Sequence, residues 1–226
     1  VIGESYTLGA LLPSNAAAGP GQVVTLVGSD FPNGATVLVG QGGSPPFEVP
    51  SLSVNWNGTW LFVRLPQELA SSGPGVPTEV RVVSPGGASN AVVFPVTTTP
   101  GTPQITKLLE AFWDPEAPGA CGGAFATSDG TLVLDGATAV LVQAHGLDEV
   151  GSQVQLQQGG HTWTRDAGCA LGQPYAAVVP LPSATEEADA GGLPVDGAAS
   201  LRVRTRVGGV WSDWSAPMSV TLSIPG

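Results

Sequence analysis

The sequence predicts an all-β protein made of two tandem β-sandwich domains, and two features of its patterning predict this. Apolar side chains recur at every second position in short runs such as Val80-Arg81-Val82 and Leu201-Arg202-Val203. That period places alternate side chains on one face, which is the pattern of a half-buried antiparallel strand. Turn-forming pairs such as Asn33-Gly34 and Gly159-Gly160 separate the runs. Short strands with this spacing are typical of a sandwich.

Length and composition agree with this fold class. The chain has 226 residues, enough for one large β-domain or two of about 100 residues each. Apolar residues make up 42% of the sequence, so a packed core is expected. The 32 glycines and 21 prolines make turns frequent and disfavour long helices.

A polar segment near the middle of the chain divides it into two similar halves. Residues 97–103 (TTTPGTP) contain no apolar side chain apart from the prolines, which is the composition of a short, stiff linker. We therefore expect domains at 1–99, including an N-terminal arm, and at 104–226. Four segments of the first half match segments of the second in order and nearly in spacing: 24–31 with 140–147, 37–43 with 154–160, 63–66 with 179–182 and 80–82 with 201–203. Such self-similarity predicts two copies of one folding unit, although alternating Val and Leu is common in any β-protein.

The first half carries a longer series of motifs. Leu12-Pro13-Ser14 is followed by Gly19-Pro20-Gly21 and by a run from Val24 to Phe31, and the series closes with a run from Val80 to Asn90 and with Phe94. From Leu11 to Val96 this order resembles the IPT/TIG family of immunoglobulin-like (E-set) domains. The resemblance implies a small sandwich of the kind used in bacterial surface proteins, in some receptors and in carbohydrate-active multidomain chains. The family has no common catalytic residues, so none is transferred. The second half is expected to be a related immunoglobulin or fibronectin-III-like sandwich.

Three arginines and two tryptophans near the C-terminus predict a stacked ladder. Arg202, Arg204 and Arg206 alternate along one expected strand, so their guanidinium groups share a face. Trp211 and Trp214 follow after a Gly-Gly turn and can fold back over them. Each well-placed pair would give a cation–π contact of roughly 0.5–1 kcal/mol at an exposed site.

The run Trp211-Ser212-Asp213-Trp214-Ser215 resembles the WSxWS element of fibronectin-III domains in class I cytokine receptors. The resemblance covers about residues 201–222 only, and the receptors' four-cysteine first domain has no counterpart here. We therefore interpret the five residues as a structural Arg/Trp ladder rather than as evidence of a receptor.

The two cysteines, Cys121 and Cys169, both fall in the second half and are expected to form one disulfide. A metal site shared with His145 and His161 is the alternative, but no C-x-x-C or H-x-x-x-H spacing supports it.

The sequence predicts no metal, no cofactor and no catalytic residue, since it contains no G-x-S-x-G, H-E-x-x-H or P-loop motif. The acidic stretch Glu186 to Asp189 is expected to be a solvated loop, with a calcium site left open.

The charge of the chain excludes nucleic acid as a partner and disfavours anionic membranes. The formal net charge is −11, the opposite of the basic field that a nucleic-acid-binding protein needs. Anionic membrane surfaces are disfavoured for the same reason. No stretch approaches the roughly 20 apolar residues of a membrane span. No signal peptide is visible, since Val1 begins a β-like sequence.

Two segments of the first half are candidate contact surfaces. If Asn57-Gly58 forms a two-residue hairpin turn, Leu52, Val54 and Trp56 face the core while Trp60 and Phe62 lie on the polar side. These two aromatics are either covered or form an exposed patch. In the N-terminal arm, Ile2, Tyr6 and Leu8 alternate as in a strand. The arm is expected to pair either with its own sheet or with a neighbouring subunit.

These observations favour a non-enzymatic structural or adhesive module of a cell-surface or extracellular assembly, such as a filament, surface layer or adhesin. A decoration or fibre protein on a viral capsid or tail is one alternative. A carbohydrate-binding accessory module of a secreted enzyme is another. The expected partners are proteins or further copies of the chain, with glycan binding left open. The expected location is extracellular or at the cell surface, or alternatively the virion surface.

Overall fold

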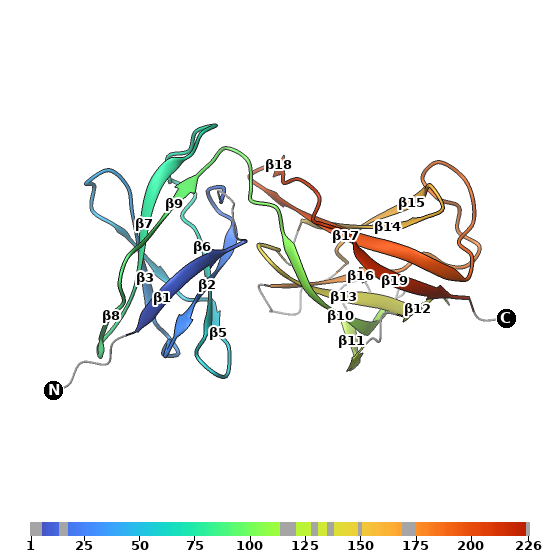
Figure 1. The fold of residues 1–226 in the computed structure, drawn as a ribbon, viewed down its shortest axis with the longest axis horizontal. Helices are drawn as coiled ribbons and strands as arrows, with labels where there is room; N and C mark the ends of the chain where they lie inside the picture. The colour runs from blue at the N-terminus through green and yellow to red at the C-terminus, as the bar shows by residue number, and fades with distance from the viewer. Residues whose placement is uncertain are drawn as a thin grey trace. The chain divides into compact units, whose positions relative to one another are not determined.

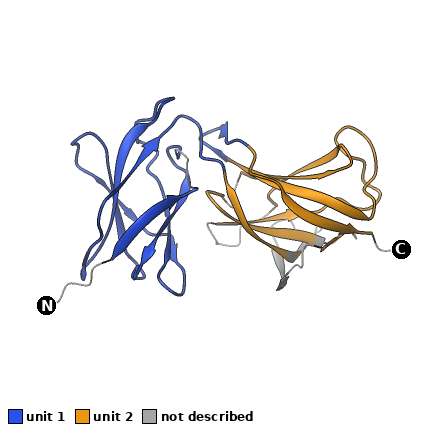
Figure 2. Cartoon of the chain, viewed as in Figure 1, with its two compact units in different colours: residues 1–102, 206–213 blue, residues 103–205, 214–226 orange. Residues whose placement is uncertain are grey.

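The structure is a computed structural model that describes residues 6–13, 18–113, 121–127, 131–134, 138–148, 151–168 and 175–224 (Figure 1). Every regular element in these residues is a β-strand, which confirms the predicted all-β class. Within the same residues, no helix has the length and apolar character needed to cross a membrane. The chain divides into two compact units: Val1–Thr102 with Arg206–Asp213, and Pro103–Thr205 with Trp214–Gly226 (Figure 2).

The first unit contains two antiparallel sheets. One has the strand order β1-β2-β6-β5 and the other the order β4-β3-β7-β8, with β9 also paired to β7. Its strands are β1 (Thr7–Leu12), β2 (Val23–Ser29), β3 (Thr36–Gly40), β4 (Phe47–Pro50), β5 (Ser53–Val54), β6 (Trp60–Arg64), β7 (Val76–Ser84), β8 (Gly87–Ala88) and β9 (Val92–Val96). Alternate side chains of both sheets form one core, including Leu26, Val37, Leu61, Val80 and Phe94.

The second set of strands repeats this arrangement. One sheet has the order β11-β10-β13-β16 and the other the order β12-β19-β17-β14-β15, with β18 also paired to β17. The strands are β10 (Gln104–Trp113), β11 (Cys121–Thr127), β12 (Thr131–Val133), β13 (Thr138–His145), β14 (Ser152–Gln158), β15 (His161–Asp166), β16 (Ala176–Pro180), β17 (Gly197–Val207), β18 (Val210–Trp211) and β19 (Met218–Ser223). Val142, Leu156, Trp163, Val179 and Leu201 belong to its core.

The two halves share one topology. Strands β1, β2 and β6 correspond to β10, β13 and β16, while β4, β3, β7 and β9 correspond to β15, β14, β17 and β19. Each of the four segment pairs that align in the sequence lies in, or starts from, a corresponding pair of strands. In both halves two sheets with this strand order pack over a common core, and the strand pairs are antiparallel except for the parallel β12–β19 pair. This arrangement defines an immunoglobulin-like sandwich. The chain is therefore an all-β protein of two tandem immunoglobulin-like sandwiches.

The segment that follows β9 is anchored to its own unit by a buried glutamine. Gln22 is fully buried; its Oε1 accepts from the Gly101 N–H at 2.7 Å and its Nε2 donates to the Gly101 carbonyl at 2.9 Å. Oε1 also accepts from the Gly19 N–H. The side-chain amide of Gln22 thus makes the same pair of hydrogen bonds to a peptide group that a neighbouring strand makes. These buried bonds fix the backbone of Gly101 to the first unit.

Candidate binding surfaces

Arginine and tryptophan side chains are stacked on the outer face of β17. The Arg204 guanidinium carbon lies 4.4 Å from the centroid of the Trp214 ring, and that of Arg202 lies 5.0 Å from the same centroid. Arg206 lies 5.5 Å from the ring of Trp211, its partner across the β17–β18 pair. The structure thus pairs each tryptophan of the predicted Arg/Trp ladder with arginine, Trp214 with Arg202 and Arg204, and Trp211 with Arg206. Its contribution to stability stays a prediction.

Glutamines of β14 extend this ladder, and sequence analysis missed them. Arg202 donates through Nε and Nη2 to Gln155 Oε1 at 2.9 and 2.6 Å, and Arg204 binds Gln153 Oε1 in the same way. The glutamines pass the network on to Thr164 and Asp166 of β15. The available signal was the alternation of Gln153, Gln155 and Gln157 along one expected strand. Because Nε and Nη2 of both arginines donate to glutamines of the neighbouring strand, this face is a structural network more than an open ligand site.

The N-terminal arm pairs with its own unit from Tyr6 onward. Strand β1 pairs with β2, and Tyr6 and Leu8 are 4% and 2% exposed within the core. At the other edge of β1, Asn90 accepts from the Leu8 N–H at 2.8 Å and donates to the Leu8 carbonyl at 2.7 Å. The interface prediction for Tyr6 and Leu8 is corrected, because their side chains are buried and Asn90 occupies the strand edge. Ile2 lies outside the described residues.

The β5–β6 hairpin differs from expectation in its turn and in its exposed residues. The predicted register is present, with Val54 opposite Leu61 and Ser53 opposite Phe62. Phe62, however, is 2% exposed and Trp60 is 36% exposed. Phe62 is therefore no surface residue, since both faces of β6 are covered at this point. Leu52 and Trp56, predicted to face the core, are 46% and 97% exposed.

The side chain of Asn55 explains why Trp56 is exposed. Its Oδ1 accepts from the N–H groups of Thr59 at 2.9 Å and of Trp60 at 2.8 Å, and its carbonyl accepts from the Gly58 N–H at 3.0 Å. The turn therefore begins at Asn55 instead of being limited to Asn57-Gly58. Gly58 has φ +68°, a conformation that favours glycine. Trp56 thus lies within the turn, outside the alternation of the strand, and projects into solvent.

This turn belongs to a cluster of loops at one end of the first unit. The Phe31 N–H donates to the Gly58 carbonyl at 2.9 Å, which joins the β5–β6 turn to the β2–β3 loop. Asn90, in the β8–β9 connection, binds Leu8 near the start of β1. We call these segments, Asp30–Ala35, Asn55–Thr59 and Ser84–Asn90, the loop end (Figure 1). At the opposite end of β9, Val96 leads into residues 97–102, the last of this stretch of the unit, where Gly101 is bound by Gln22.

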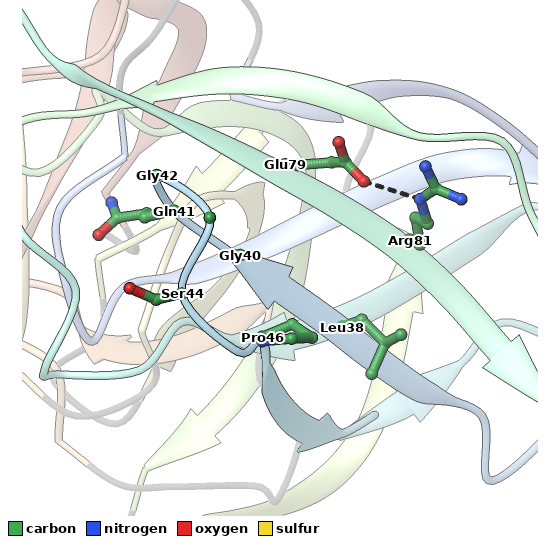
Figure 3. A pocket seen from close by; sticks show the side chains of 9 residues that line it. Leu38, Gly40, Gln41, Gly42, Ser44, Pro46, Glu79 and Arg81 are labelled. Atoms are coloured by element: carbon green, nitrogen blue, oxygen red, sulfur yellow. Dashed lines mark hydrogen bonds and ion pairs between the residues drawn. The ribbon is translucent and has the colours of Figure 1, made fainter.

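A shallow pocket lies on the outer face of β3 and β7 in the first unit (Figure 3). Leu38 and Pro46 supply apolar surface, and Arg81 Nε donates to Glu79 Oε1 at 2.8 Å. The glycine-rich loop over the pocket is anchored by Gln41, which bonds to Ala70 and Thr78. Because the one ion pair is made between residues that are about half exposed, it contributes little to stability.

The predicted disulfide lies largely outside the described residues. Cys169 is not among them, and of Cys121 only the backbone, at the start of β11, is described. The pairing of Cys121 with Cys169 therefore stays a prediction.

In the second half, the side chains of both histidines, Glu186 and Asp189 are buried, packed against the chain or bonded to neighbouring residues. His145 is 6% exposed, and its burial lowers the pKa of the imidazole. His161 lies against Gly192, whose missing side chain makes room for the ring. In the acidic loop, Glu186 forms an ion pair with Arg165, and Asp189 accepts from Thr164 Oγ1 at 2.8 Å. The described residues contain no group of three His, Cys, Asp or Glu side chains arranged to hold a metal ion.

Comparisons with known proteins add structural likenesses only. No family model matches the sequence, and no curated protein matches it. Among solved structures, the chain is similar to the BSP domain of a biofilm associated protein, at 15% identity and a TM-score of 0.36, over 92% of this chain and 29% of that one. It is also similar to the FN1–FN3 domains of chicken CNTN1, at 11% identity and a TM-score of 0.28, over 96% of this chain and 66% of that one.

A third likeness is to a tetra-tandem repeat in the extending region of a large adhesion protein, at 9% identity and a TM-score of 0.30. It covers 97% of this chain and 48% of that one. The chain thus spans less than two thirds of the length of each of these three. At such identities and TM-scores the likenesses carry no argument about function.

Proposed function

We propose that the chain is a non-enzymatic adhesive or structural module of a cell-surface or extracellular assembly, and that it makes contact through the loop end of its first unit. The observation that carries the proposal is the indole of Trp56, which is 97% exposed on a turn held by the hydrogen bonds of Asn55. A large apolar side chain fixed in solvent gains free energy when a partner covers it.

The position of the turn supports this assignment. The loop end lies opposite the point where the chain leaves the first unit, so its loops are presented away from the connection. Rigid sandwiches commonly carry their binding residues on such loops. The anchoring of Gly101 by Gln22 gives the connection a defined direction at this unit, which suits a module that has to display one end.

Two edge strands, β1 and β15, each have a backbone group covered by a side chain or a loop. Asn90 binds the backbone of Leu8 at the edge of β1, and the Asp189 N–H donates to the Thr162 carbonyl of edge strand β15 at 2.7 Å. Side chains or loops that occupy an open edge disfavour strand addition. We therefore place the contact on the loop end rather than on a free strand.

The IPT/TIG assignment of the first half and the extracellular location belong to the same proposal. No specific observation favours the virion surface.

The test is attachment under flow. Beads coated with the full chain through its C-terminus are passed over cells of the organism that encodes it, and the bound beads are counted. We expect Trp56→Ser to reduce attachment at least fivefold. Val93→Ser is the matched control, because Val93 is 63% exposed on β9 outside the loop end, and it should attach as the wild type does. Equal attachment by Trp56→Ser and wild type would show that the loop end is not the contact surface.

A further inference from the structure

We propose that Trp56 is a stacking platform for a neutral carbohydrate. This inference rests on the proposed function and names the ligand class of the same site. It follows from three properties of the loop end: the area it offers, the charges around it and the polar groups beside the indole.

The exposed apolar area is too small for a standard protein interface. An aromatic side chain buries about 150–250 Å², and Trp56 is 97% exposed. Trp56 is the one exposed large hydrophobic residue within the loop end, so the apolar area there is on the order of 200 Å², which is about half of the apolar share of the roughly 800 Å² that each partner buries in a standard interface. A ligand that needs to cover little more than one ring fits this surface better than a protein does.

Charge excludes anionic ligands at the same place. Residues 6–102 contain two basic side chains, Arg64 and Arg81. Arg64 donates to the Gly21 carbonyl, and Arg81 donates to Glu79 on β7. Asp30 is the one charged residue of the loop end, and its backbone carbonyl carbon lies 3.6 Å from the position of a Cβ on Gly58. A local carboxylate and a net charge of −11 repel phosphate headgroups and sulfated polymers.

The residue after Trp56 carries polar donors that a sugar hydroxyl group can accept from. The negative face of an indole attracts the weakly positive C–H groups on one face of a pyranose. Asn57 Oδ1 accepts from Thr59 Oγ1 at 2.7 Å, which leaves the Nδ2 donors of Asn57 for the hydroxyl groups of a ligand. Because Asn55 fixes the turn before any ligand binds, little conformational entropy is lost on binding.

The experiment measures binding of the full chain to insoluble neutral polysaccharides: cellulose, chitin, a β-1,3-glucan and starch. A single ring binds weakly, so the chain is displayed on beads to gain avidity. We expect at least one polymer to retain the wild type. Trp56→Tyr should keep binding within about threefold, Trp56→Leu should lose at least tenfold, and Val93→Ser should be unchanged. The Leu variant is decisive because it keeps apolar character but lacks the π-face.

Two outcomes would overturn the inference. One is that none of the polymers retains the chain. This outcome overturns the inference whether or not the chain binds phosphatidylcholine vesicles, which serve as a second, non-carbohydrate surface. The other is equal retention of Trp56→Leu and Trp56→Tyr, which would assign the side chain to hydrophobic docking. If Trp56→Ser lowers attachment to cells while no polysaccharide binds, the carbohydrate inference fails and the adhesive function stands. If attachment does not depend on Trp56, the proposed function fails by itself.

Discussion

Corresponding outer faces of the two sandwiches are filled in different ways. Where the second has Gln155 opposite Arg202, the first has Leu38 opposite Arg81. In the second, the arginine binds glutamine and stacks on Trp214. In the first, Arg81 binds the exposed Glu79 of its own strand and lines an open pocket. One fold therefore supports either a closed network or an open face, depending on a few outward-facing residues.

The same comparison separates what the sandwiches share from what only one has. Ser89 and Ser215 make equivalent bonds: each donates its N–H at 2.8 Å to a valine carbonyl, Val82 or Val203, and accepts that valine's N–H through Oγ at 3.0 Å. The serine that ends the Trp211–Ser215 motif thus has a counterpart in a half without tryptophan at this position, where Ala88 precedes Ser89. The serine closes the strand edge in both, and the stacked tryptophan is an addition.

The largest expected difference in stability between the halves comes from the predicted disulfide. A disulfide between Cys121 and Cys169 would close a span of 169 − 121 = 48 positions, which corresponds to about 4 kcal/mol in the chain-entropy model. Reduction should therefore lower the stability of the second sandwich and leave the cysteine-free first one unchanged, as followed by hydrogen exchange in β14 and in β3. Alkylation of the unfolded, unreduced chain, read by intact mass, provides the direct check. Two alkylated thiols would contradict the bond.

The next largest expected change in unfolding free energy comes from replacing Ser89 or Ser215. Ser89→Ala and Ser215→Ala each leave a buried valine N–H without its side-chain acceptor, because both serines are about 95% buried, at 5% and 4% exposure. We expect a cost of about 1–3 kcal/mol in each case, with similar values for the two variants. Urea unfolding followed by hydrogen exchange in each sandwich measures both. A large cost in only one half would show that the two serines are not equivalent.

A smaller effect is expected from the arginines, and here the two halves should differ. Arg204→Ala removes two hydrogen bonds to Gln153 and the contact with Trp214, for which we expect about 1–2 kcal/mol. Arg81→Ala, the matched control, removes an exposed ion pair and should cost at most about 0.5 kcal/mol. Equal effects in urea unfolding would mean that the ladder adds nothing beyond an ordinary surface arginine.

Period and turn chemistry predicted most of the fold, because alternating burial constrains strands strongly. The alternating arginines also led to Trp211 and Trp214. Prediction was wrong where a side chain replaced a backbone partner, because Asn55 moved the start of the turn and exposed Trp56. Of the two pairings expected for the N-terminal arm, the structure has the one with its own sheet, and Asn90 binds at the outer edge. It was wrong again at Phe62, since alternation separates two faces but does not show which of them is covered. Gln153 and Gln155 were missed because glutamine has no strong preference for such a role.

The prediction with the smallest effect at neutral pH concerns the pH response of the second sandwich. His145, on β13, has a pKa lowered by burial below its usual value of 6.5. As the pH falls through 6.5 the unfolded chain takes up a proton that the folded chain resists, so stability decreases toward acid with a slope of at most about 1.4 kcal/mol per pH unit from this group. His145→Gln removes the group while keeping a polar side chain. Urea unfolding of both proteins from pH 8 to pH 5 should show their difference in free energy to be constant above about pH 7 and to shift in favour of the variant below it. Carboxylates titrate in both proteins and cancel in the difference. Parallel curves over the whole range would show that the buried imidazole is not linked to folding.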